Sequence, residues 1–223
     1  MKMKTLTLAV STLAFAVTGV ACAHEPEQAA PETTQTAVEA DAPVEQKSAF
    51  GPDSPFASEI YTFLVEDALF GPGACRTVFV GSSSIRFWMT LEDDFAELEP
   101  VNRGFGGSQI ANVNAYFDVL LKPHQPREIV FYAGENDINA GVAPEEVANR
   151  FKAFMDKKTN AFGDAPVYFV SIKPSIARAG EFADQQEANE LIKAYADIRG
   201  DLTFIDVTEG MMEDGQPKDI FIF

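Results

Sequence analysis

Strand-like and helix-like segments alternate along most of this chain, and the alternation constrains its fold more than any other feature. Short runs rich in β-branched and aromatic residues predict strands at residues 77–81, 98–102, 128–133, 167–172 and 202–207. Apolar residues at helical spacing predict helices over residues 54–70, 108–121, 144–158 and 181–198. Ser54 and Ser108 are the expected caps of the first two of these helices. Strands separated by helices pair in parallel, so we expect an α/β three-layer sandwich with a flavodoxin-like five-stranded parallel sheet.

Polar or glycine-rich segments follow three of the predicted strands: Ser82–Ser84, Gly104–Ser108 and Gly134–Asp137. The carboxyl ends of parallel strands share one edge of the sheet, where such folds bind ligands. A serine hydroxyl can attack an acyl carbon, and glycine N–H groups and an asparagine amide can donate to the resulting oxyanion. Each segment alone could be a helix cap or a tight turn. Their occurrence at three strand ends favours a catalytic site.

These segments resemble the Ser, Gly and Asn blocks of the SGNH hydrolase superfamily, also called the GDSL esterase/lipase family. The resemblance runs from about Phe56 to the end of the chain. It implies that Ser83 is the nucleophile and that Gly107 and Asn136 are oxyanion donors, together with the N–H of Ser83. It also implies carboxylic esters as substrates (lipids, acetylated sugars or other short esters), with neither a metal nor an organic cofactor.

The chain departs from the family pattern in two places. Ser82 replaces the usual aspartate before the nucleophile, which leaves the choice among Ser82, Ser83 and Ser84 open. The family's Asp-x-x-His block would begin where this chain stops, at Phe223, so we expect the catalytic Asp and His and the last helix of the fold to be missing from it. Only two histidines occur, and neither His24 nor His124 is expected to reach the nucleophile.

The missing pair of residues supports a second hypothesis from another class. It describes a catalytically inactive envelope protein with this fold that binds a carbohydrate or an acyl ligand. Turnover that depends on Ser83 would distinguish the two hypotheses. The formal net charge of −17 argues against nucleic acid as a partner, because phosphate binding requires clustered Lys and Arg.

The first 23 residues predict an export signal, with a basic start at Met1–Lys4 and an apolar run from Leu6 to Val20. Cleavage after Ala23 would release a periplasmic or secreted protein. Cleavage before Cys22 would instead leave a lipid-bearing cysteine that attaches an outer-membrane lipoprotein to its membrane. Residues 24–48 are acidic and rich in Ala, Pro, Gln and Thr, which predicts a disordered linker ahead of a C-terminally truncated hydrolase-like domain at residues 49–223.

Overall fold

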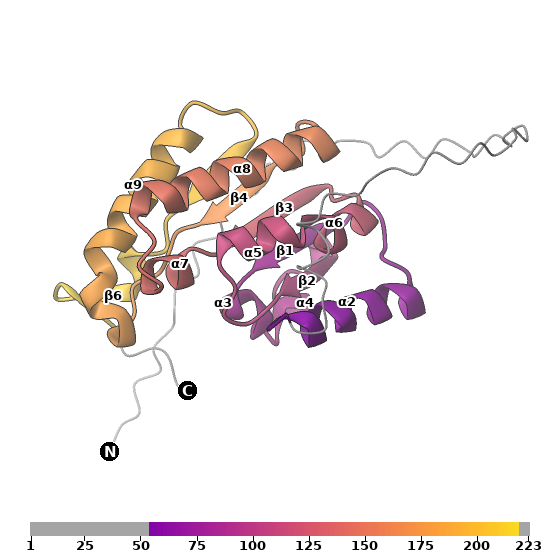
Figure 1. The fold of residues 1–223 in the computed structure, drawn as a ribbon, viewed down its shortest axis with the longest axis horizontal. Helices are drawn as coiled ribbons and strands as arrows, with labels where there is room; N and C mark the ends of the chain where they lie inside the picture. Colours follow the sequence, from indigo (N-terminus) through magenta and orange to yellow (C-terminus); the bar gives the residue numbers. More distant parts are fainter. Residues whose placement is uncertain (1–53, 219–223) are drawn as a thin grey trace, which may run out of the picture. The chain divides into compact units, whose positions relative to one another are not determined.

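The structure, a computed structural model, describes residues 54–218, so the predicted export signal and linker lie outside the described residues. Within this part of the chain, five parallel strands form one sheet in the order β2-β1-β3-β4-β5 (Figure 1). The strands are β1 (Thr77–Gly81), β2 (Pro100–Gly104), β3 (Glu128–Tyr132), β4 (Val167–Val170) and β5 (Leu202–Ile205). This is the flavodoxin-like order, which confirms the predicted fold class.

Helices connect the strands in chain order. The longer ones are α2 (Ala57–Phe70), α5 (Ile110–Ala115), α8 (Pro144–Phe162) and α9 (Phe182–Ala196). The shorter elements are α3 (Ser83–Arg86), α4 (Leu91–Asp94), η1 (Ala96–Leu98), α6 (Phe117–Leu120), η2 (Lys122–His124), α7 (Glu135–Asn139), η3 (Ile176–Glu181) and η4 (Glu209–Met211), and a small hairpin pairs β6 (Met212–Glu213) with β7 (Gln216–Pro217). None of the helices within residues 54–218 combines the length and the hydropathy that a bilayer crossing requires.

Aromatic rings fill the core between the sheet and the long helices. Phe131 of β3 lies 4.6 Å from Phe154 and 5.1 Å from Phe151, both on α8, measured between ring centroids. Phe169 of β4 lies 4.6 Å from Phe151, and all four rings are fully buried. Aromatic pairs at these distances add to the hydrophobic gain from burial. The central strands are apolar along their length because a second cluster, around Phe79, covers their other face.

The predicted helix over residues 108–121 is wrong in one respect, because Tyr116 divides it into α5 and α6. Gln109, not Ser108, caps α5, in a reciprocal arrangement with the Asn112 side chain. The Ser108 side chain is fully buried, and its hydroxyl donates to the Gly81 carbonyl over 3.2 Å. Ser108 therefore joins two loops at the sheet edge instead of starting the helix.

The start of α2 also differs from the prediction. The helix begins at Ala57, and its first turn has no side-chain cap. The Ser54 hydroxyl shares a 2.6 Å hydrogen bond with the hydroxyl of Tyr116, 62 residues away in the chain, and its Oγ also accepts from the N–H of Phe56 over 3.3 Å. Ser54 therefore caps the turn that leads into the helix and also makes a tertiary hydrogen bond. A third difference concerns β2, which starts two residues later than predicted because residues 96–98 form η1.

Candidate active site

The three serines that follow β1 differ in how far they are buried and in whether they line a cavity. Gly81 has a φ of +145°, and the N–H of the next residue, Ser82, donates to the Tyr132 carbonyl over 2.9 Å. Ser82 is only 2% exposed, so it cannot meet a ligand in solution. Ser83, the first residue of α3, is half-buried and lines a cavity of about 1000 Å³. Ser84 lines the same cavity.

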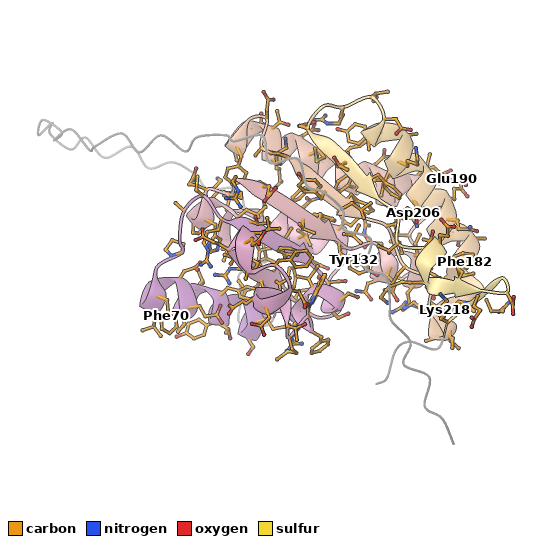
Figure 2. The ribbon with its side chains drawn as sticks, turned by 180° about the vertical axis from the view of Figure 1, so that it is seen from behind. Phe70, Tyr132, Phe182, Glu190, Asp206 and Lys218 are labelled. Carbon is orange, nitrogen blue, oxygen red and sulfur yellow. The ribbon has the colours of Figure 1, made fainter. Side chains whose placement is uncertain are left out.

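The cavity lies at the carboxyl edge of the sheet and receives residues from several strand ends. They include Ser83 after β1, Asn136 after β3, Lys173 and Arg178 after β4, and Met211 and Lys218 near the small hairpin. Figure 2 labels Lys218 beside this hairpin and Tyr132, the last residue of β3, toward the middle of the fold. The predicted meeting of the Ser and Asn segments at one edge is therefore confirmed.

Asn136 lies in the first turn of α7, two residues after Gly134, which precedes the helix. Gly134 has a φ of +122°, and a Cβ there would lie 2.7 Å from Ile172 Cδ1. The Asn136 Nδ2 donates to the Ser108 carbonyl over 3.0 Å. Gly107, directly before Ser108, is exposed with a φ of +76°, and it is not among the residues that line the cavity. The structure therefore places Ser83 and Asn136 in one cavity. Gly107 lies outside its lining, next in the chain to Ser108, the residue that Asn136 contacts.

Asp137 is a fully buried carboxylate that supports this loop. Its Oδ2 accepts from the N–H of Ile110 over 3.0 Å, and its Oδ1 accepts from Arg150 Nη1 over 2.9 Å. Burial raises the pKa of the Asp137 carboxyl, and these donors partly offset the effect. These contacts link α7 to the start of α5, so the role of Asp137 here is structural.

The Glu135 carboxylate, which lines the cavity, has three donors as partners. It accepts from the Tyr132 hydroxyl over 2.9 Å and pairs with Lys173 Nζ and Arg178 Nε, each over 3.2 Å. Burial, followed by the charge of Glu135, raises the pKa of the Tyr132 phenol well above its ordinary value. The phenol therefore remains protonated at neutral pH and can only donate to Glu135. Glu135 is thus a fixed counter-ion for the two cations.

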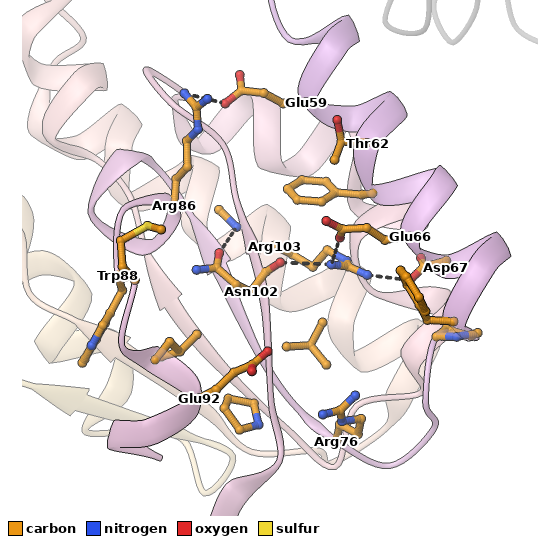
Figure 3. Close-up of a pocket in the computed structure, with 18 of the residues that line it drawn as sticks. Glu59, Thr62, Glu66, Asp67, Arg76, Arg86, Trp88, Glu92, Asn102 and Arg103 are labelled. Atoms are coloured by element: carbon orange, nitrogen blue, oxygen red, sulfur yellow. Dashed lines mark hydrogen bonds and ion pairs between the residues drawn. The ribbon is translucent and has the colours of Figure 1, made fainter. Parts of the chain in front are cut away.

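His124, the one histidine within residues 54–218, lies in a different network. Figure 3 shows the cavity of about 680 Å³ beside it, where the Arg103 guanidinium points to Glu66 and Asp67. Arg103 Nε donates to His124 Nε2 over 3.1 Å, and His124 Nδ1 lies 2.6 Å from the Pro72 carbonyl. Since Nε2 accepts, the ring proton is on Nδ1 and the imidazole is neutral. His124 does not line the cavity that holds Ser83.

The surroundings of His124 oppose its protonation. Burial and then the charge of Arg103 lower its pKa from the ordinary 6.5, and Arg76 acts in the same direction. The Pro72 carbonyl and Asp67 act against them. The folded chain therefore binds a proton here at a lower pH than the unfolded chain does.

We expect this histidine to make the fold less stable as the pH falls below about 6.5, because the unfolded state then binds the additional proton. The contribution is fully present above that pH. Urea unfolding between about pH 7.5 and 5.5 should show the loss, and His124→Gln, which keeps a donor and an acceptor, should show less of it. Equal pH dependence in the two proteins would contradict the assignment.

Several charged side chains near these cavities carry no motif in the sequence. Arg86 and Arg103 form ion pairs to Glu59 over 2.8 Å and to Asp67, respectively, which brace the loops beside the smaller cavity. Lys173 follows β4 and lines the cavity that holds Ser83. Arg178 lies in η3, in a stretch that carries no motif, so no sequence signal pointed to it.

Comparisons with known proteins identify the family and the fold of this chain. The family model described as GDSL-like lipase/acylhydrolase matches residues 76–221. A protein of Streptococcus pneumonia, provisionally described as a platelet activating factor, superposes with a TM-score of 0.65 and 19% identity, over 74% of this chain and 82% of that one. A GDSL-like lipase from Bacteroides thetaiotaomicron gives a TM-score of 0.58 and 18% identity, over 73% and 90%. No curated protein matches in sequence. At 18% and 19% identity, the two solved structures show a shared fold alone.

Proposed function

Because this chain belongs to the GDSL-like lipase/acylhydrolase family, we propose that it hydrolyses carboxylic esters, with Ser83 as the nucleophile and Gly107 and Asn136 as oxyanion donors. One observation carries the assignment of residues. A serine at the end of β1 and an asparagine amide at the end of β3 line the same cavity. The hydrogen bond from Asn136 to the Ser108 carbonyl connects the glycine-rich segment Gly104–Ser108 to these two residues.

In the proposed reaction the Ser83 oxygen bonds to the carbonyl carbon of the ester, and the carbonyl oxygen becomes an oxyanion. The Asn136 amide and the N–H groups of Gly107 and Ser83 donate to that oxygen. The bond to the alcohol then breaks, and the alcohol leaves with the serine proton. Water releases the acyl group from Ser83 as a carboxylic acid in a second step.

The described lining of the cavity contains no histidine to carry the serine proton. Its carboxylate, Glu135, is bonded to Tyr132, Lys173 and Arg178. The first substrate should therefore have a leaving group that departs without a proton donor. p-Nitrophenyl acetate meets this requirement, and its small acyl group makes the least demand on the shape of the cavity.

We expect wild-type protein treated with p-nitrophenyl acetate to release p-nitrophenolate and to carry one acetyl group on Ser83. Intact mass and peptide mapping would locate that group. Ser83→Ala should lose the modification and at least about 100-fold in rate, because it removes the proposed nucleophile. Ser58→Ala, a change at an exposed serine on α2, is the matched control and should behave as wild type.

Three outcomes would contradict the proposal. The first is turnover that survives Ser83→Ala, and the second is an acetyl group that maps to Ser84. The third is a folded wild-type protein that neither turns over nor becomes acylated. In that case the hypothesis of an inactive carbohydrate- or acyl-binding protein would replace the esterase.

A further inference from the structure

Arg178 bonds directly to the proposed oxyanion donor Asn136. Its Nη2 donates to Asn136 Oδ1 over 3.3 Å. The arginine lies in η3, at a residue whose backbone departs from helical geometry (φ −123°, ψ 25°), and its side chain is 22% exposed. It therefore reaches the amide from a segment 42 residues further along the chain.

The two partners of the Asn136 side chain fix which way its amide points. A guanidinium has donors only, so the atom facing Arg178 must be the carbonyl oxygen. The backbone carbonyl of Ser108 is an acceptor only, so the atom facing it must be the Nδ2 nitrogen. One Nδ2 hydrogen is used by Ser108, and the second remains for a ligand. Without Arg178, only the Ser108 carbonyl would hold the amide in this orientation.

The guanidinium of Arg178 is itself held by carboxylates. Its Nε pairs with Glu135 Oε1 over 3.2 Å, and its Nη1 with Glu181 Oε2 over 3.4 Å. Glu135 is fixed in turn by Tyr132 and Lys173. These contacts orient the fork of Arg178 so that Nη2 points to Asn136. A lysine could not reproduce this, because a single ammonium lacks the planar fork.

We propose that Arg178 is a positioning residue for catalysis: it holds and polarises the Asn136 amide so that the remaining Nδ2 hydrogen can stabilise the oxyanion. The inference rests on the proposed ester hydrolysis. Hydrogen bonds in a chain strengthen one another, so a cation on Oδ1 makes Nδ2–H a better donor. The benefit arises where negative charge develops, which is in the transition state.

The expected consequence is a loss in kcat with little change in KM for a small neutral ester. Removing an oxyanion donor outright costs about 100- to 1000-fold in kcat, so Arg178→Gln, which leaves the donor present but less well held, should cost roughly tenfold. Arg178→Lys should recover only part of the loss. Arg127→Gln is the matched control, since Arg127 pairs with Glu128 at the opposite end of the strands, and it should leave kcat unchanged.

A double-mutant cycle separates this role from a merely structural one. If Arg178 acts through Asn136, Arg178→Gln should have almost no further effect on kcat in an Asn136→Ala background. An undiminished effect there, or a raised KM with unchanged kcat in Arg178→Gln alone, would overturn the proposal in favour of fold maintenance or direct substrate binding.

A readout without turnover keeps the test independent of the proposed function. The Asn136 side-chain amide signals in NMR spectra should shift and broaden in Arg178→Gln but not in Arg127→Gln. Unchanged signals would overturn the inference even in an active enzyme. Conversely, a turnover rate that is unchanged in Ser83→Ala would refute ester hydrolysis through Ser83. The NMR comparison would still decide whether Arg178 holds Asn136.

Discussion

Gly81→Ala is expected to prevent folding, with a loss of more than about 4 kcal/mol in the free energy of unfolding. A Cβ at this position would lie 1.8 Å from the Tyr132 carbonyl oxygen, which is backbone at the carboxyl end of the central strand β3. The glycine also has a φ of +145°, where an L side chain is strained. Neither β1 nor β3 can move aside, because the two strands pair in register along their length. Circular dichroism and urea unfolding of the purified variant would measure the effect.

The control for Gly81 is Gly141→Ala. Gly141 also has a positive φ, of +79°, but no atom lies within 4 Å of the Cβ that alanine would add. This variant should therefore show only the strain of the backbone, about 1 kcal/mol. If Gly81→Ala folded with a similarly small loss, the close packing of β1 against β3 at the start of the serine turn would be wrong.

Asp201→Ala should lower the free energy of unfolding by about 3–5 kcal/mol, because it leaves a buried ammonium without its counter-ion. Lys158 on α8 is fully buried, and its Nζ bonds to Asp201 and to the Gly163 carbonyl. The forked contact from Arg199, followed by that from Lys158, holds the pKa of Asp201 at about 2, so the carboxylate is charged at any ordinary pH. Urea unfolding at neutral pH would measure the loss.

Two further variants test the reason for that loss. Adding Lys158→Met to Asp201→Ala should restore most of the stability, since an apolar side chain of similar length needs no counter-ion. Asp197→Ala removes the partner of Lys193 in an exposed pair, whose side chains are 56% and 62% exposed, and should change the stability by less than about 1 kcal/mol. Failure of the double variant to recover would show that Asp201 stabilises the fold by some other route.

The sequence was sufficient to predict the sheet and to predict that two site residues lie at the same edge of it. Alternating periodicity is a local property, and right-handed crossovers then restrict the strand order, so β2-β1-β3-β4-β5 was predictable. Ser83 and Asn136 were predictable as neighbours because each follows the carboxyl end of a parallel strand. Both deductions need only local patterns and one general rule of topology.

What could not be predicted depends on contacts between distant residues. Tyr116 interrupts a regular helical pattern where its hydroxyl meets Ser54, and Ser108 turns inward to the Gly81 carbonyl. Arg178 reaches Asn136 from a turn without apolar period or motif. Such contacts are set by how the packed elements approach one another, and no local pattern in the chain encodes them.

The three loops of the candidate site are tied together by their own backbone and side chains. The Gly81 carbonyl accepts from the Phe105 N–H over 3.0 Å and from the Ser108 hydroxyl, and the Ser108 carbonyl accepts from Asn136. This network is complete without any ligand. The entropy of arranging these three loops is therefore lost when the chain folds. Under the proposed function, an ester that enters the cavity gives up only its own freedom of motion.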